Sequence, residues 1–165
     1  SKAYDIAEDA HEGQSYGDSS YYYGHILTVV ETFEGMAVLF GLDDDSLVIG
    51  TCIAILHDVL EDTDYTSEQL IEELILKDTI EFKLLAELIV LGVQVLTHST
   101  SDPYNSYVQK IVAAGELELM LVKLADLQTN ILSVGTHPDP TFKERKLPIY
   151  KEAVKTLTRA IVEVL

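Results

Sequence analysis

Apolar side chains recur every three or four positions along most of the chain, which is the period of an α-helix. The segment from 25 to 40 illustrates this spacing, with apolar residues at Ile26, Val29, Val30, Phe33, Met36, Ala37 and Phe40. Sustained alternation of apolar and polar residues, which is typical of half-buried strands, does not occur. The pattern therefore predicts an all-α domain of about seven or eight helices.

Capping signals indicate where several of these helices begin and end. Asp43, Thr66 and Asp102 precede apolar-periodic segments and can accept hydrogen bonds from free backbone N–H groups. Gly115 is suited to end a helix, because glycine adopts the left-handed backbone conformation without strain. The predicted helices span residues 3–12, 25–40, 43–60, 66–76, 79–97, 102–114, 116–134 and 142–165. The segments 13–21 and 137–140, rich in glycine and serine or in proline, are predicted to be loops.

Composition supports one folded domain over residues 1–165, since 47% of the side chains are hydrophobic and 24% are charged. The single cysteine, Cys52, excludes a disulfide framework and a cysteine-based zinc cluster. No apolar run reaches the ~18 residues that a membrane span needs. The first residues also lack a signal-peptide pattern, so we expect a cytoplasmic protein that does not contact a membrane.

The chain carries a net charge of −17, with 28 acidic residues against 11 lysines and arginines. Such a protein repels DNA and RNA, which are bound through lysine and arginine contacts to phosphates. Small anionic substrates are opposed as well, unless a metal ion or a local basic patch reverses the field.

The segment Ile55–Thr63 places four ionisable residues where an apolar helix ends: His57, Asp58, Glu61 and Asp62. Their spacings of three and four residues put them on one helix face. Three carboxylates at the negative end of a helix dipole are unfavourable unless a cation compensates them. A divalent metal ion would do so; the alternative is a solvated helix end in a generally acidic protein.

Two further positions favour the metal. Asp126 and Asn130 share one face of an otherwise apolar helix, where an aspartate must be paired or act as a ligand. His25 stands at the start of another predicted helix. His25, His57, Asp58 and Asp126 together offer two imidazoles and two carboxylates, a donor set that suits Mn²⁺, Fe²⁺ or Zn²⁺.

These motifs identify a family resemblance. The chain resembles the HD-domain phosphohydrolases, and within them the hydrolase domain of RelA/SpoT proteins and the small metazoan SpoT homologs. The matching positions are Ala10–Gln14 (AHEGQ), Tyr22, His25, Leu56–Thr63 (LHDVLEDT), Tyr104, Tyr107, Val122–Asp126 (VKLAD), Asn130, Phe142, Lys146 and Tyr150. The likeness runs from about residue 3 to residue 155.

The resemblance implies a stand-alone hydrolase that removes the 3′-pyrophosphate from guanosine tetra- or pentaphosphate. The implied metal ligands are His25, His57, Asp58 and Asp126, and the ion is usually Mn²⁺. The implied catalytic pair, which positions and deprotonates the attacking water, is Glu61 and Asp62. Burial among other carboxylates should raise the pKa of one of them. The expected substrate-binding residues are Tyr16, Tyr22, Asn130, Ser133, Lys143 and Lys146.

Departures from the family pattern keep alternatives open. Tyr16 and Gly17 stand where the family has an arginine and a lysine, and Leu127 stands where it usually has arginine. Tyr16 can stack on a purine but supplies no charge. Another phosphorylated nucleotide such as NADPH is therefore an alternative substrate, and a non-catalytic nucleotide-binding module is an alternative function.

Several residues also have simpler interpretations. Lys143, Arg145 and Lys146 could neutralise the leaving phosphate or form a solvated basic stretch. Apart from Tyr22, the Tyr21–Tyr23 run is expected to serve packing. His98 and His137 are expected to be surface loop residues.

Overall fold

The computed structural model describes residues 1–165 and confirms the all-α class. Its helices are α1 (Lys2–Ala10), α2 (Leu27–Leu39), α3 (Asp44–Leu56), α4 (Val59–Asp62), α5 (Ser67–Leu74), α6 (Ile80–Leu96), α7 (Tyr104–Ala114), α8 (Leu117–Gly135) and α9 (Pro140–Val164). A π-helical turn, η1 (Tyr22–Ile26), leads directly into α2. Each of the eight predicted helices corresponds to one of the longer helices, with ends that differ by a few residues.

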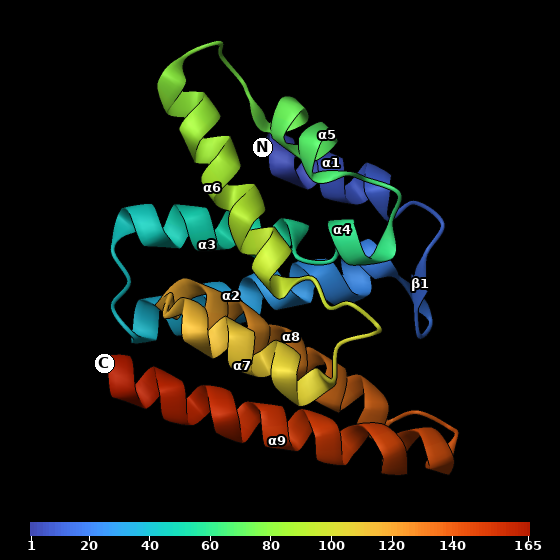
Figure 1. Cartoon of the computed structure of the whole chain (residues 1–165). Helices are drawn as coiled ribbons and strands as arrows, with labels where there is room; N and C mark the ends of the chain where they lie inside the picture. The colour runs from blue at the N-terminus through green and yellow to red at the C-terminus, as the bar shows by residue number, and fades with distance from the viewer.

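The helices stack in layers around α8 (Figure 1). Helix α8 packs against α2 and α3 on one side and against α9, which runs along the lower edge, on the other. Helix α7 also packs on α9, while α6 crosses α3. Helices α1 and α5 lie together at the top of the view, and α1 also contacts α3. None of the helices is both long enough and apolar enough to cross a bilayer.

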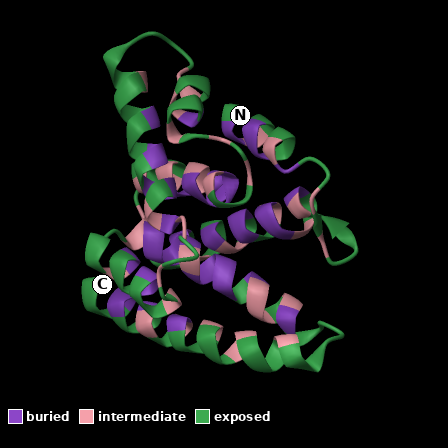
Figure 2. Ribbon diagram, turned by 45° about the vertical axis from the view of Figure 1, so that its right-hand side comes forward, coloured by how far each residue is buried: buried purple, intermediate pink, exposed green.

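The core lies where α2, α3 and α8 face one another, and buried positions line these faces (Figure 2). The contact between α2 and α3 is close because Gly50 has no side chain. A Cβ atom at Gly50 would lie 2.3 Å from the Phe33 ring. Helix α8 is buried almost all round from Leu119 to Leu127, so a polar residue in this stretch is enclosed by protein.

The structure interrupts the helix predicted from 43 to 60. Helix α3 ends at Leu56, a turn follows at His57 and Asp58, and α4 begins at Val59. The Nδ1 atom of His57 lies 2.7 Å from the carbonyl oxygen of Ala54, the acceptor that the Asp58 N–H would use in a continuous helix. A side-chain contact of this kind competes with the helical bond and favours the break.

The loop predicted over residues 13–21 contains a short antiparallel hairpin, β1 (Ser15–Tyr16) and β2 (Ser19–Ser20). Gly17 begins its two-residue turn with a φ of +59°, a left-handed conformation that glycine adopts without strain. Strands of two residues are too short to alternate visibly, which explains why the sequence pattern did not predict them.

Candidate metal and catalytic centre

Four residues from three separate parts of the chain converge at one point. His25 comes from η1, His57 and Asp58 from the turn between α3 and α4, and Asp126 from α8. All four are buried, and one donor atom from each lies within 4.8 Å of the others. The structure thus brings together the four residues predicted to bind a metal ion.

The distances between the donor atoms fit a coordination shell. The Nε2 atoms of His25 and His57 are 3.3 Å apart, and they lie 3.3 and 2.9 Å from Oδ2 of Asp58. Oδ1 of Asp126 is 3.1 Å from Nε2 of His25 and 3.6 Å from that of His57. Ligands bound at about 2.0–2.2 Å from an ion stand roughly 3.0–3.4 Å from one another. The donor set and its spacing therefore suit one divalent cation.

The charges in this cluster depend strongly on one another. Burial opposes the charged form of His57, but Asp58 and Asp126 outweigh it and raise the pKa of His57 well above its usual value. Burial likewise opposes ionisation of Asp126, yet Lys123 and the two imidazoles hold its pKa well below the ordinary range. Two buried carboxylates thus require positive charge nearby, which a divalent cation would also supply.

Surrounding groups fix the orientation of the predicted ligands. The contact between Nδ1 of His57 and the Ala54 carbonyl turns Nε2 towards the cluster. The Asn130 amide donates to Oδ1 of Asp126 at 3.0 Å, and Lys123 Nζ donates to Oδ2 at 2.7 Å. Both oxygens of Asp126 are therefore held by its own helix.

The predicted catalytic pair lies on α4 beside the cluster. Oε1 of Glu61 accepts a hydrogen bond of 2.6 Å from the backbone N–H of His98. Oδ2 of Asp62 accepts one of 3.3 Å from the Tyr21 hydroxyl. Partial desolvation, together with the nearby charge of Asp58, raises the pKa of both carboxylates, whereas the sequence led us to expect this of one of them.

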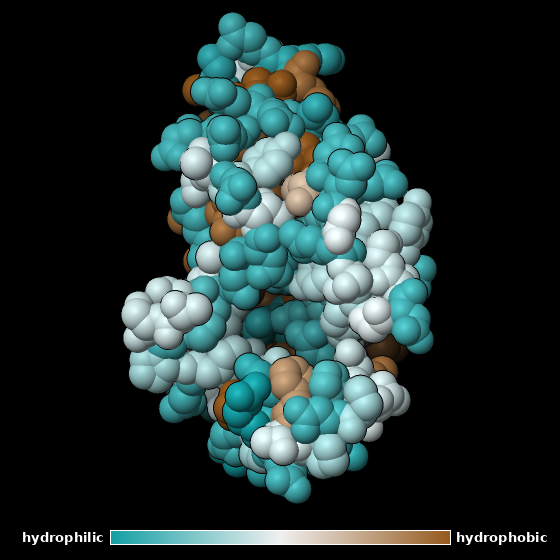
Figure 3. Space-filling view, turned by 90° about the vertical axis from the view of Figure 1, so that its right-hand side faces the viewer, coloured by the Kyte–Doolittle hydropathy of each residue, from teal (hydrophilic) through white to brown (hydrophobic).

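A polar cleft of about 290 Å³ opens onto these residues. It is lined by Tyr21, Asp58, Glu61, Asp62, His98, Tyr104, Lys123, Asp126, Asn130, Lys146, Ile149 and Tyr150. Figure 3 views this side of the molecule, which is hollowed across its middle and hydrophilic in the hollow. Four carboxylates but only two lysines line the cleft, so an anionic ligand that enters it would meet mostly negative charge.

Three of the predicted substrate-binding residues lie at or next to the cleft. Asn130 and Lys146 are part of its lining. The Tyr16 hydroxyl donates to Oδ1 of Asn130 at 3.0 Å and lies 3.2 Å from the Thr129 carbonyl. The hairpin is therefore tied to α8 at the rim of the cleft.

The other three predicted positions are not part of the cleft lining. Tyr22 is buried in the hydrophobic core and packs edge-on against Tyr23, because the π-helical turn directs it inward. The structure therefore gives no support for a direct contact between Tyr22 and the substrate. Lys143 is exposed on the first turns of α9, and Ser133 is half-buried near the end of α8.

Two polar residues of the cleft were not predicted from the sequence. Tyr21, expected only to pack, has its hydroxyl 2.6 Å from Oδ2 of Asp58. His98, expected at the surface, has its ring 4.8 Å from the Tyr107 ring and its Nε2 2.7 Å from the Asp102 carbonyl oxygen. Neither residue lies at a helical spacing from the central motif, so the sequence pattern held no signal for them. His137 is exposed, as predicted, and stacks on Phe142.

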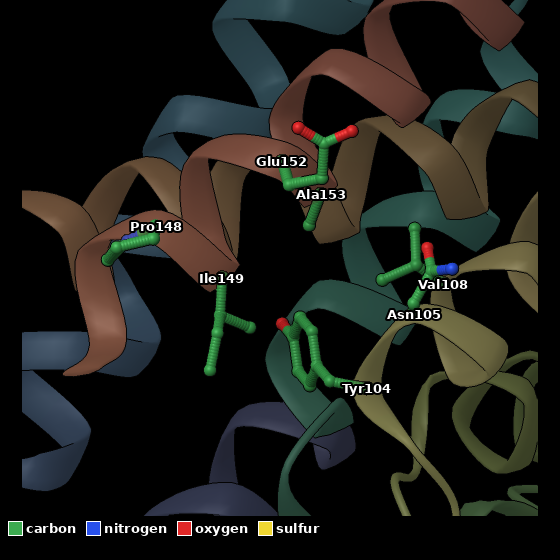
Figure 4. Close-up of a pocket in the computed structure, with 7 residues that line it drawn as sticks. All are labelled: Tyr104, Asn105, Val108, Pro148, Ile149, Glu152 and Ala153. Atoms are coloured by element: carbon green, nitrogen blue, oxygen red, sulfur yellow. The ribbon is translucent and has the colours of Figure 1, made fainter.

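A second hollow, of about 460 Å³, lies between α7 and α9 (Figure 4). Helix α7 contributes Tyr104, Asn105 and Val108, and α9 contributes Pro148, Ile149, Glu152 and Ala153. It shares Tyr104 and Ile149 with the polar cleft, but it contains none of the predicted ligands or catalytic carboxylates.

Comparison with known proteins agrees with the motifs. Over 141 residues the chain is 32% identical to guanosine-3′,5′-bis(diphosphate) 3′-pyrophosphohydrolase of Haemophilus influenzae, a match that covers 81% of this chain. The chain spans only 18% of the length of that protein. No family model matches the chain.

A solved structure of a metazoan ortholog of SpoT, described as hydrolysing ppGpp and playing a role in starvation responses, has a similar fold. Its TM-score is 0.69 at 17% sequence identity, and the match covers 99% of this chain and 91% of that chain. The resemblance expected from the motifs is thereby confirmed: the chain is similar in sequence to this guanosine-3′,5′-bis(diphosphate) 3′-pyrophosphohydrolase and has the fold of the metazoan SpoT ortholog.

Proposed function

We propose that residues 1–165 form one catalytic domain that hydrolyses guanosine 3′,5′-bis(diphosphate) to GDP and pyrophosphate with the help of one divalent metal ion. The observation that carries this proposal is the buried group of two histidines and two aspartates, with the Glu61 and Asp62 carboxylates beside it in one cleft. The activities named for the Haemophilus influenzae relative and the metazoan ortholog support the choice of substrate.

The proposed ligands are His25, His57, Asp58 and Asp126, and the proposed ion is Mn²⁺. Mixed imidazole and carboxylate ligands suit this ion, although they accept Fe²⁺ and Zn²⁺ as well. When bound there, a divalent cation would polarise a phosphoryl oxygen and lower the pKa of a coordinated water.

A carboxylate on α4 would accept the proton that the attacking water loses. Either Glu61 or Asp62 accepts this proton as the water oxygen bonds to the phosphorus next to the 3′ oxygen. The bond between that phosphorus and the 3′ oxygen breaks, and the 3′ oxygen becomes a hydroxyl by taking up a proton, which the same carboxyl group returns or solvent supplies. A raised pKa suits this task, because a stronger base takes the proton more readily near neutral pH. The hydrogen bond from His98 leaves Oε2 of Glu61 for this role.

Substrate would enter between the hairpin and the start of α9. Lys146 is the cleft lysine without a carboxylate partner, and we assign it to the phosphates, with Lys143 one turn away. Asn130 supplies an amide to the nucleotide, and Ser133 a hydroxyl near it. The ring of Tyr16 offers a face on which a purine can stack.

A nucleotide panel tests this proposal. The purified chain would be incubated with guanosine tetraphosphate, NADPH and an adenine analogue, with Mn²⁺ or with a chelator, and the products separated by chromatography. We expect release of pyrophosphate from guanosine tetraphosphate, only when the metal is present. Turnover confined to compounds without a 3′- or 2′-phosphate would contradict the proposal.

NADPH is the second candidate substrate, favoured by the absence of lysine and arginine from the hairpin and its turn, residues 15–20. A hairpin without positive side chains at the cleft rim suits a substrate that places fewer negative charges next to it. Release of inorganic phosphate from NADPH, with guanosine tetraphosphate left intact, would assign this activity. Tight nucleotide binding without turnover in metal-loaded protein would instead indicate a binding module.

A further inference from the structure

The hydroxyl oxygen of Tyr21 contacts both a proposed metal ligand, Asp58, and a proposed catalytic carboxylate, Asp62. Tyr21 stands immediately before η1, and its hydroxyl lies 2.6 Å from Oδ2 of Asp58 and 3.3 Å from Oδ2 of Asp62. Oδ2 of Asp58 is also the oxygen that faces Nε2 of His25 and of His57. Tyr21 thus joins a proposed metal ligand to a proposed proton acceptor.

The position of the Tyr21 ring does not depend on these hydrogen bonds. The ring lies between two imidazoles, with its centroid 5.0 Å from that of His11 and 4.9 Å from that of His25. Tyr16 packs edge-on against it at 5.8 Å. Packing on three sides fixes the direction of the hydroxyl, and a phenylalanine would keep all three contacts.

The hydroxyl is well suited to lie between two carboxylates. A phenol is neutral near pH 7, so its hydroxyl keeps the proton that it donates to a carboxylate. Asp58 and Asp62 would otherwise repel each other, and a shared donor reduces this repulsion. The carboxylate of Asp62 accepts no other hydrogen bond, although Gln14 binds its backbone carbonyl oxygen.

We propose that Tyr21 is a positioning residue of the hydrolytic centre, whose hydroxyl holds the Asp58 and Asp62 carboxylates in a fixed relation to each other. This inference rests on the proposed function, because that function assigns Asp58 to the metal and Asp62 to the pair of carboxylates from which the proton acceptor comes. Without the hydroxyl, Asp62 is free to rotate towards solvent and Asp58 loses a group that orients it.

The test compares Tyr21→Phe with the matched control Tyr23→Phe. Tyr23 is 62% exposed, and its hydroxyl lies 3.4 Å from Glu8, away from the cleft. Thermal melting first establishes that both variants fold like the wild type. Isothermal titration with Mn²⁺ alone then gives the metal affinity, and steady-state hydrolysis of guanosine tetraphosphate gives kcat and KM separately.

We expect Tyr21→Phe to bind Mn²⁺ about tenfold more weakly and to lower kcat by roughly 10–100-fold at saturating metal, which are typical losses for a group that orients a metal ligand. KM should stay within about twofold, since the hydroxyl holds protein groups and not substrate. Tyr23→Phe should match the wild type in every respect.

The proposal is overturned if Tyr21→Phe keeps the wild-type kcat and Mn²⁺ affinity. It is also overturned if KM alone rises, because the hydroxyl would then contact the substrate, or if the wild type binds no Mn²⁺. If the wild type binds Mn²⁺ but does not hydrolyse guanosine tetraphosphate, the proposed substrate is wrong. The metal affinities of the two variants then decide the role of Tyr21.

Discussion

Replacing Lys123 with methionine removes a nearly buried cation but keeps a side chain of similar length. The Lys123 side chain is 11% exposed, and its Nζ lies 2.7 Å from Oδ2 of Asp126. It also lies over the rings of Tyr104 and Tyr107, at 5.7 and 5.1 Å from their centroids. The substitution therefore breaks one ion pair and two cation–π contacts at the edge of the candidate metal site.

The expected loss of stability follows from the burial of this pair. Removing one partner of a buried ion pair costs about 3–5 kcal/mol, whereas an exposed pair is worth about 0–1 kcal/mol. We take the lower end, about 3 kcal/mol, because His25 and His57 also balance the charge of Asp126. In a chain of this size, each kcal/mol shifts the melting temperature by about 2–4 °C, so the metal-free variant should melt roughly 6–12 °C lower.

Thermal melting followed by circular dichroism measures this effect, with Lys110→Met as the control. Lys110 forms an ion pair of 2.8 Å with Asp102 but is 70% exposed, so its loss should shift the melting temperature by no more than about 4 °C. Saturating Mn²⁺ should restore part of the stability of the Lys123 variant, because a bound cation also balances Asp126. Equal melting temperatures for the two variants without metal would refute this reasoning.

Three further predictions concern the site and the core. Glu61→Gln should keep Mn²⁺ and lose turnover, whereas Asp126→Ala should lose Mn²⁺; equal metal content and full activity in both would reject their roles. Burial raises the pKa of Glu61 above the ordinary glutamate value of about 4.3. Since only the ionised carboxylate accepts a proton, kcat should fall when the pH drops through this raised pKa. An inflection at or below pH 4.3 would contradict this. Gly50→Ala should cost about 1–3 kcal/mol in urea unfolding, because its Cβ would overlap the Phe33 ring, while Gly135→Ala, with open space around it, should not destabilise. Equal unfolding midpoints would argue against the close contact of α2 and α3.

The helices could be predicted from the sequence because burial imposes a helical period on apolar residues. Asp126 could be predicted as a functional residue for the same reason, since a carboxylate on an apolar helix face needs a partner. The family motifs then linked it to His25 and to the His57–Asp58 pair. The convergence of these segments is a tertiary property, and no spacing within one helix encodes it.

What the sequence did not predict depends on local backbone geometry. Three tyrosines stand in a row, and the π-helical turn decides that Tyr21 reaches the cleft while Tyr22 enters the core. The His57 contact with Ala54 that favours the break after α3 is likewise a local event inside an apolar stretch. His98 reaches Glu61 through its backbone N–H, a group that every residue except proline carries. Side-chain identity therefore gave no indication of this contact.

Anomalous diffraction at the manganese edge, from crystals grown with Mn²⁺, tests the central claim most directly. The proposed site predicts one strong peak within about 2.0–2.3 Å of Nε2 of His25 and of His57 and of one carboxylate oxygen each from Asp58 and Asp126. A peak elsewhere, or no peak among these four side chains in crystals that contain manganese, would contradict the proposed metal centre and the hydrolytic function built on it.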